Sequence, residues 1–320
     1  MDNRITKSRL KILLSYDLIK LFALILAGVV LWSLLFTIFG ASLSEGQSFN
    51  VYWYNVNVYE NELQEMLDAD GEGGFKTYET YETTTYNFGM YSPSNTTMPQ
   101  QFAAWSSVGQ LDILFLSGAA DIEETEQNEN GETVTVKRSL VDNYGDHFIA
   151  LSGLAESAVR YCKDNGGYTV DGKPQTDDKA KQFFHSRQRK SNFYRHEIFT
   201  EDMEVERLEK IWNAAKKLDK WLNDETLDIW ATKTVTVGGV SEEVICGIDM
   251  GKLEKVGANA QTGKTSSSLC GYNAALKEEG ESVAEGVVLA VMDNKSKQPH
   301  GIYESLLFVV AVVENYSSLS

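Results

Sequence analysis

One long uncharged stretch dominates the pattern of hydrophobic and polar positions near the start of the chain. Residues 21–41 contain no charged side chain and are mostly Leu, Ala, Ile, Val and Phe. As a helix they would be about 31 Å long, which matches the hydrocarbon core of a bilayer. The pattern predicts a transmembrane helix over 21–41, after a basic segment, 1–20. A cleaved signal peptide is the alternative, but its apolar region is usually only about 7–15 residues long.

After a polar linker, the chain alternates between segments with strand-like patterns and segments with helical spacing of apolar residues. Residues 49–56 form an aromatic and β-branched run that is typical of a buried strand, and 60–69 carry Leu and Met at helical spacing. Residues 75–88 favour a second strand, 92–110 a short helix, and 111–118 a nearly all-apolar third strand. This order of strands and helices predicts right-handed crossovers and an α/β fold.

The remaining chain continues with both kinds of element. Apolar residues at helical spacing predict helices at 151–162 and 201–222. Two strands are expected within 231–250, and a strand followed by an apolar helix within 286–316. Residues 119–139 are acidic and polar, and they are expected to form a hairpin outside the core.

The charge distribution gives the predicted transmembrane helix an orientation. The first 41 residues hold five basic and two acidic groups, whereas the rest holds 24 basic and 44 acidic groups, a net charge of −20. Because basic flanks stay on the cytoplasmic side, we expect a cytoplasmic N-terminus and an extracellular C-terminal domain. The whole chain carries −17, so nucleic acid, whose phosphates repel an acidic protein, is excluded as a partner.

Residue types that often carry catalysis or bind metal do not form a recognisable pattern. The three cysteines, Cys162, Cys246 and Cys270, are too few for a disulfide framework, so we interpret them as core residues, with one disulfide pair as the alternative. The four histidines lack metal-ligand spacing, and Ser152 lacks the flanking glycines of a nucleophile elbow. The sequence predicts no enzyme activity, no metal and no cofactor.

Residues 258–265 (ANAQTGKT) approximate a phosphate-binding loop. The segment has Ala in place of the first Gly, a charged stretch before it and a poor helix start after it. A solvated turn is therefore the expected structure, rather than a nucleotide site.

Two stretches resemble the extracellular solute-binding proteins of ABC importers, in particular the sugar-binding group that includes maltose-binding protein. The first is FNVYWYN together with QQFAAWSSVGQLDILFLSG, and the second is VVLAVMDNKSKQPHGIYESLLFVVAVVENY. The resemblance implies a two-lobed, type II periplasmic-binding-protein-like domain. Relative to that family, the chain is expected to be shortened at its C-terminus and to keep a permanent membrane anchor.

The resemblance also implies a division into lobes. Lobe 1 would comprise 49–119 and 284–320, lobe 2 would comprise 145–283, and 120–144 would be an acidic crossover between them. Closure of two such lobes on a hinge would couple binding to transport or sensing.

Candidate ligand-binding residues lie where the predicted parallel strands end. Ligands of α/β sheets bind at the carboxyl ends of the strands. Aromatic faces there can stack on a sugar ring, while Ser and Asp can hydrogen-bond to its hydroxyl groups. The alternative for Trp53 and Trp230 is that they are core aromatics. The predicted set is Trp53, Tyr54, Ser117 and Gly118, with Trp230 and Asp249 facing them from the second lobe.

Two functions follow as hypotheses. The first is a membrane-anchored protein that binds a small solute, such as a carbohydrate, and works with a membrane transporter. The second is a non-enzymatic structural or assembly subunit of a cell-envelope complex, with a protein of that complex as its partner.

Overall fold

The structure is a computed structural model, and it divides into two compact units, Met1–Ser42 and Leu43–Ser320. The residues that it describes are 7–8, 11, 20, 22–33, 48–71, 74–78, 85–91, 102, 104–105, 110–118, 122–127, 133–169, 177–188, 200–237, 240–259, 268–271, 284–293 and 302–316.

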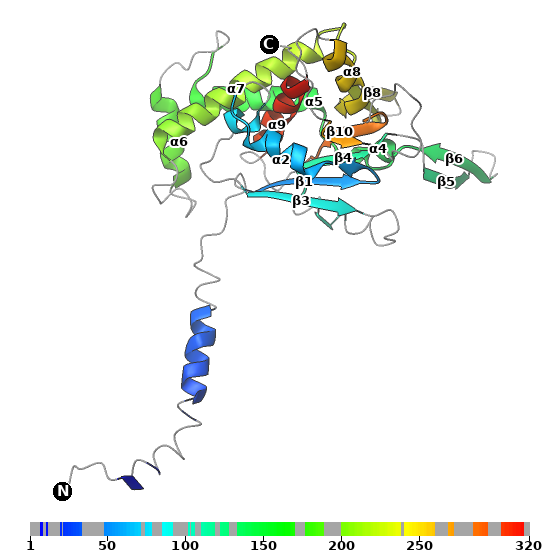
Figure 1. Cartoon of the computed structure of the whole chain (residues 1–320). Coiled ribbons are helices and arrows are strands. Elements are labelled where there is room, and N and C mark those ends of the chain that lie inside the picture. Colours follow the sequence, from blue (N-terminus) through cyan, green and yellow to red (C-terminus); the bar gives the residue numbers. More distant parts are fainter. Residues whose placement is uncertain are drawn as a thin grey trace. The chain divides into compact units, whose positions relative to one another are not determined.

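In the first unit, residues 22–33 are helical and every one of their side chains is exposed (Figure 1, blue). Phe22 is 68% exposed and Trp32 is 65% exposed, so most of the apolar surface of this helix is accessible. Across the described residues, no helix is long and apolar enough to cross a membrane. Residues 21 and 34–41, which the predicted span also needs, lie outside the described part.

A six-stranded mixed sheet forms the centre of the second unit (Figure 1). Its strands are β1 (Ser48–Tyr54), β3 (Thr85–Tyr91), β4 (Ile113–Ser117), β7 (Trp230–Val237), β8 (Val240–Asp249) and β10 (Val287–Val291). Their order in space is β3-β1-β4-β10-β8-β7. β1 is parallel to β3 and β4, whereas β10 runs antiparallel to both β4 and β8, and β7 runs antiparallel to β8. Four strands, β1, β3, β4 and β8, therefore end at the same edge of the sheet.

Sequence explains why β4 and β10 lie in the middle. Their sequences, ILFLS and VVLAV, are apolar at almost every position, and all ten residues are buried. Strands covered on both faces need such continuous apolar runs. Two small pairs lie outside this sheet: β2 (Asn57–Val58) with β9 (Cys270–Gly271), and β5 (Ile122–Gln127) with β6 (Thr133–Arg138).

Helices cover one face of the sheet, and Figure 1 shows α2, α5, α7 and α9 gathered on that side. They are α2 (Glu60–Asp68), α5 (Leu151–Gly166), α7 (Glu201–Leu222) and α9 (Tyr303–Tyr316), and α8 (Met250–Asn259) and the 3₁₀ helix η2 (Phe75–Tyr78) pack into the same core. α9 is buried on nearly all sides, and its Phe308 ring lies 5.2 Å from the ring of Phe49 in β1. This apolar C-terminal helix is the centre of the larger core.

A smaller core covers the opposite face. It holds Phe102, the short helix α4 (Leu140–Asn143), and Phe148, which follows the 3₁₀ helix η3 (Gly145–His147), packed on Leu114, Leu116 and Ala290 of the sheet. The sheet is therefore enclosed between a thick helical layer and a thin one.

Most of the predicted elements are present. The α/β prediction is confirmed, and β1, α2, β4, α7, β10 and α9 lie where the sequence places them. Residues 75–78, predicted as strand, instead form η2, because Phe75 turns inward onto Phe49 and Phe308. Helix α6 (Asp177–Gln188) and α8 were not predicted; α6 has few apolar positions, and α8 follows β8 without a break. The predicted 92–110 helix and the 258–265 turn lie mostly outside the described residues.

The predicted lobes share one sheet. β10 pairs with β4, so the segments 49–119 and 284–320 are neighbours. β7 and β8, from the segment 145–283, extend that same sheet, and Leu43–Ser320 forms one compact unit. A separate second lobe stays a prediction, and it would have to be built without β7 and β8.

Candidate functional site

The sheet brings the six predicted ligand-binding residues together at its carboxyl-terminal edge. Two neighbouring rows of the sheet cross the central strands from β1 to β8, and the first continues into β7. One row consists of Trp53, Phe115, Leu289, Ile248 and Trp230. The next consists of Tyr54, Leu116, Val288 and Asp249. Trp53 and Trp230, which are far apart in sequence, thus lie in the same row across the sheet.

Ser117 and Gly118 complete this edge. Ser117 pairs with Val287, and the Gly118 N–H donates to the Gly286 carbonyl at 2.8 Å. At about 4.8 Å between strands, Tyr54 and Asp249 lie about 14 Å apart. We call the set Tyr54, Ser117, Gly118, Trp230 and Asp249 the carboxyl edge.

The arrangement corrects one expectation. Trp230 and Asp249 do not face Trp53 and Tyr54 from another unit, because β8 and β7 belong to the same sheet as β1. β10 is the reason: it joins β4 on one side and β8 on the other.

The six residues differ in their access to solvent. Trp53 is 5% exposed within the larger core, as the core-aromatic alternative predicts, and Ser117 is fully buried. Tyr54, Gly118, Trp230 and Asp249 are partly exposed. Tyr54 packs against the smaller core and Trp230 against the larger one, so their side chains lie on opposite faces of the sheet at this edge.

Two polar groups at the edge have distinct local roles. The Asp249 Oδ1 accepts a hydrogen bond from the Lys252 N–H at 3.1 Å, so this carboxylate caps the start of α8. The indole Nε1 of Trp230 is buried and has no hydrogen-bond partner among the described residues. A buried donor of this kind is uncommon and can be satisfied by a bound polar group.

Aromatic side chains surround Tyr54 on the thin side of the sheet. Its ring meets that of Tyr144 edge-on at 6.4 Å, and Tyr144 lies 4.6 Å from Phe102. Burial raises the pKa of the Tyr54 hydroxyl, which stays protonated and can donate a hydrogen bond at neutral pH. Nearby, the ring of Tyr52 occupies the space above Gly89, where a Cβ would lie only 2.1 Å from it.

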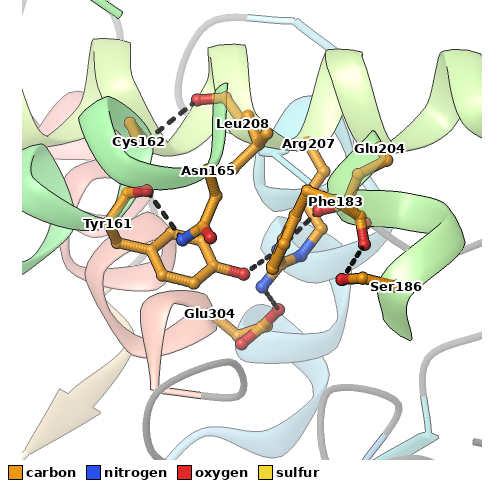
Figure 2. Close-up of polar contacts among 9 residues, drawn as sticks. All are labelled: Tyr161, Cys162, Asn165, Phe183, Ser186, Glu204, Arg207, Leu208 and Glu304. Atoms are coloured by element: carbon orange, nitrogen blue, oxygen red, sulfur yellow. Dashed lines mark hydrogen bonds and ion pairs between the residues drawn. The ribbon is translucent and has the colours of Figure 1, made fainter. Parts of the chain in front are cut away.

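A second polar site was not predicted: a buried charge cluster between the helices α5, α7 and α9 (Figure 2). The side chains of Glu204 and Arg207 are completely buried, and that of Glu304 is 7% exposed. Arg207 Nη1 lies 3.4 Å from Glu204 Oε1 and donates to the Tyr161 hydroxyl at 3.1 Å, while Nη2 lies 3.6 Å from Glu304 Oε1. One guanidinium thereby joins α5, α7 and α9.

A sequence signal for this cluster exists. Positions 204, 208, 211 and 215 recur at helical spacing, so Glu204 lies on the apolar face of α7, which also buries Arg207. Charged residues on a buried face must be paired, and that requirement points to an internal ion pair. The partner Glu304 lies about a hundred residues away, and sequence reasoning could not find it.

The cluster is enclosed and suits a structural role. Burial raises the pKa of the neighbouring Cys162 thiol to about 12, and it raises the pKa of Tyr303 to about 12. Both groups are therefore neutral, and Cys162 is a poor nucleophile at physiological pH.

Lys233 in β7 is a second buried cation, 9% exposed. Its Nζ donates to the Gly145 carbonyl at 2.5 Å and to the Phe148 carbonyl. Burial lowers its pKa and also lowers that of the nearby His147. The ammonium holds the end of η3 against the sheet.

No group of three His, Cys, Asp or Glu side chains in the described ranges could hold a metal ion. The three cysteines are buried and form no disulfide. A comparison of the chain with protein-family models, curated proteins and solved structures finds no match. The resemblance to solute-binding proteins stays a prediction.

Proposed function

We propose that this protein is a membrane-anchored, non-enzymatic binding protein that takes a small solute at the carboxyl edge. The observation that carries the proposal is the convergence of Tyr54, Gly118, Trp230 and Asp249, from four different strands or their ends, on one edge of one sheet. All four are partly exposed, and they offer an aromatic side chain on each face of the sheet, a carboxylate and a close approach to backbone. Such edges are the usual ligand sites of α/β proteins.

The anchor is supported by the first unit. A helix that is apolar on all sides and exposed on all sides is unstable in water but suited to a bilayer. In the proposal, 21–41 spans the cell membrane with the N-terminus in the cytoplasm, and Leu43–Ser320 lies outside. More specifically, we propose that the domain has a two-lobed architecture of the type II solute-binding kind, that the solute is a carbohydrate, and that the partner is a membrane transporter.

Ligand-dependent stabilisation tests the binding function. A library of sugars, amino acids and short peptides is screened by thermal unfolding of the purified full chain. A true ligand at about 100 times its Kd adds about 2.7 kcal/mol, which raises Tm by about 5 °C or more. Tyr54→Leu and Asp249→Asn should remove the shift. Tyr86→Leu, at the opposite edge of the sheet, should retain it, and a library without any shift would count against solute binding.

Charge insertion tests the anchor. Leu26→Lys combined with Val30→Lys places two charges mid-span, at about 2.5–3.5 kcal/mol each. This variant should leave the membrane fraction on alkaline extraction. Ser44→Lys with Gln47→Lys adds the same charge beyond the span and should stay membrane-bound. Full extraction of the unaltered chain would overturn the anchor.

The assembly-subunit hypothesis is the second candidate. The burial of Trp53 and Ser117 favours it, because a solute could touch only part of the predicted contact set. Purification in mild detergent separates the two. A stoichiometric protein partner that persists without added solute supports assembly, whereas recovery of the chain alone supports the first proposal.

A further inference from the structure

Strand β3 forms one end of the six-stranded sheet and pairs, within the described chain, with β1 on one side only. Its sequence, TYNFGMY, contains no charged residue and no proline. Natural sheets usually protect their edges with Lys, Pro, bulges or a covering element, because an edge strand presents unpaired backbone groups. In β3 these protective residues are missing.

The other end of the sheet is different. β7 carries Lys233 and has an irregular register between Ala231 and Thr232. α4 and η3 lie against it, and the Lys233 Nζ donates to the carbonyl groups of Gly145 in η3 and of Phe148, which follows η3. β7 is therefore covered and tied down, which leaves β3 as the end suited to pairing.

An exposed apolar side chain lies on the same strand. Met90 is 64% exposed, and of the large hydrophobic side chains described in Leu43–Ser320 only Tyr59, at 39%, is also exposed. Tyr86 and Phe88 lie on the same face as Met90 and are half-buried against the core. β3 thus combines an edge that has no strand beside it in the described part of the chain with an apolar row, Tyr86, Phe88 and Met90.

We propose that β3 docks against β3 of a second copy of this chain, antiparallel and centred on Phe88. In this register Phe88 faces its own copy, and Tyr86 faces Met90 of the second copy, twice by symmetry. Opposed Cβ atoms in such pairs lie about 4.5–5.5 Å apart, and a thioether beside an aromatic ring is favourable. The two six-stranded sheets become one continuous sheet, and Met90 is covered.

Charge favours a second copy as the occupant. Each chain carries −17, so two copies repel each other wherever acidic surfaces meet. The uncharged β3 lets them approach with little of that repulsion. Two-fold symmetry makes one strand complementary to itself, so no other surface is needed.

Cysteine pairing tests the register directly. Full chains carrying Tyr86→Cys and Met90→Cys are mixed in detergent and oxidised; the three native cysteines are buried and stay inert. The mixture should give a crosslinked dimer of both variants, and each variant alone should give little. Thr234→Cys, exposed on β7, is the control and should not crosslink. Absence of the mixed dimer, equal crosslinking of the control, or capture of a different protein would each overturn the proposal.

A charge on the edge gives a second, independent readout. Met90→Lys should weaken the dimer about tenfold or more in sedimentation, because two symmetric side-chain pairs are lost. At concentrations where the parent is also monomeric, its melting temperature should match that of the parent, since Met90 is mostly exposed in the single chain. Thr234→Lys adds the same charge to β7 and should leave the dimer intact. A monomeric unaltered chain, or a dimer that survives Met90→Lys, would refute the pairing.

Discussion

At the scale of single residues, Arg207 shows how a charge is kept inside an apolar layer. Its guanidinium contacts two carboxylates and a phenol, and its Cζ also lies 5.7 Å from the centre of the Tyr161 ring. A buried ion pair adds little net stability relative to apolar residues, but removing one partner leaves the others desolvated and unneutralised. The cluster is therefore intolerant of single changes.

Arg207→Met should lower the free energy of unfolding by about 3–5 kcal/mol, because Glu204 and Glu304 would remain buried without their cation. Urea unfolding measures the change. Lys210→Met is the matched control: Lys210 in the same helix pairs at 2.9 Å with Glu206, whose side chain is 63% exposed, and its loss should cost less than about 1 kcal/mol. Equal effects of the two changes would contradict a buried network.

The buried thiol of Cys246 should make the stability of the fold depend on pH in the alkaline range. Burial raises its pKa from 9.0 to about 11, so between these values the folded thiol keeps a proton that the unfolded thiol has lost. The folded state binds more protons, and stability falls as pH rises, by about 1.4 kcal/mol per pH unit for one such group. Cys246→Ala should reduce the slope between pH 9 and 11.

The control for this experiment is Thr232→Ala, exposed on β7, which should leave the slope unchanged. Lys233 acts in the opposite sense: its pKa is lowered by burial, so its burial cost is relieved as pH rises. For that reason the test is the difference in slope between Cys246→Ala and the parent, and not the slope of a single curve. A slope that is identical in parent and Cys246→Ala would exclude the thiol as a contributor.

At the scale of elements, α7 and α9 are joined by two ion pairs at equal spacing. Arg207 pairs with Glu304, and Lys217 pairs with Glu314, ten residues further along each helix. The helices therefore run in the same direction. The α9 segment between the two glutamates is almost wholly apolar, so its packing alone fixes its rotation and position weakly. The two ion pairs near its ends fix the position of α9 along α7.

Charge exchange tests this position. Lys217→Glu should destabilise the fold by about 2 kcal/mol, because it sets a second carboxylate beside Glu314, whose side chain is only 3% exposed. Adding Glu314→Lys should restore most of that loss. The coupling energy from a double-mutant cycle should be about 1–3 kcal/mol, and a value near zero would mean that the pair does not hold α9.

Elements with strong periodicity could be predicted, and weak ones could not. α7 has a regular apolar stripe from Leu208 to Leu218, and β4 is almost all apolar. α6 buries only Ala180 and Phe184 of its described side chains, so its pattern resembles a loop. The two-residue strands β2 and β9 depend on each other across more than two hundred residues, and no local pattern reveals them.

At the scale of the whole molecule, the carboxyl edge was predictable in part. The rule that parallel strands end together places Tyr54 and Ser117 side by side from sequence alone. The position of Asp249 beside them depends on β10, which comes from near the other end of the described chain. Strand pairing at that separation is decided by tertiary packing.

The two units predict how the chain responds to truncation. A chain lacking residues 1–42 should fold with a melting temperature within a few degrees of the parent, because Leu43–Ser320 is compact by itself. A chain ending at residue 302 should not fold. It loses seven fully buried Leu, Phe and Val side chains from 306–313, worth about 10 kcal/mol or more. Circular dichroism on heating distinguishes the outcomes, and a cooperative transition in the second chain would contradict this role of α9.

The central place of β10 sets the order in which the sheet can form during synthesis. β4 and β8 cannot be bridged until residues 287–291 are available, and α9 follows only after them. A nascent chain emerging N-terminus first therefore carries an incomplete sheet until residues 287–291 appear, and closure over such sequence separations is slow. In the proposed topology the domain crosses a membrane as an extended thread, and this delay would keep the sheet from closing before residues 287–291 have passed through the translocation channel.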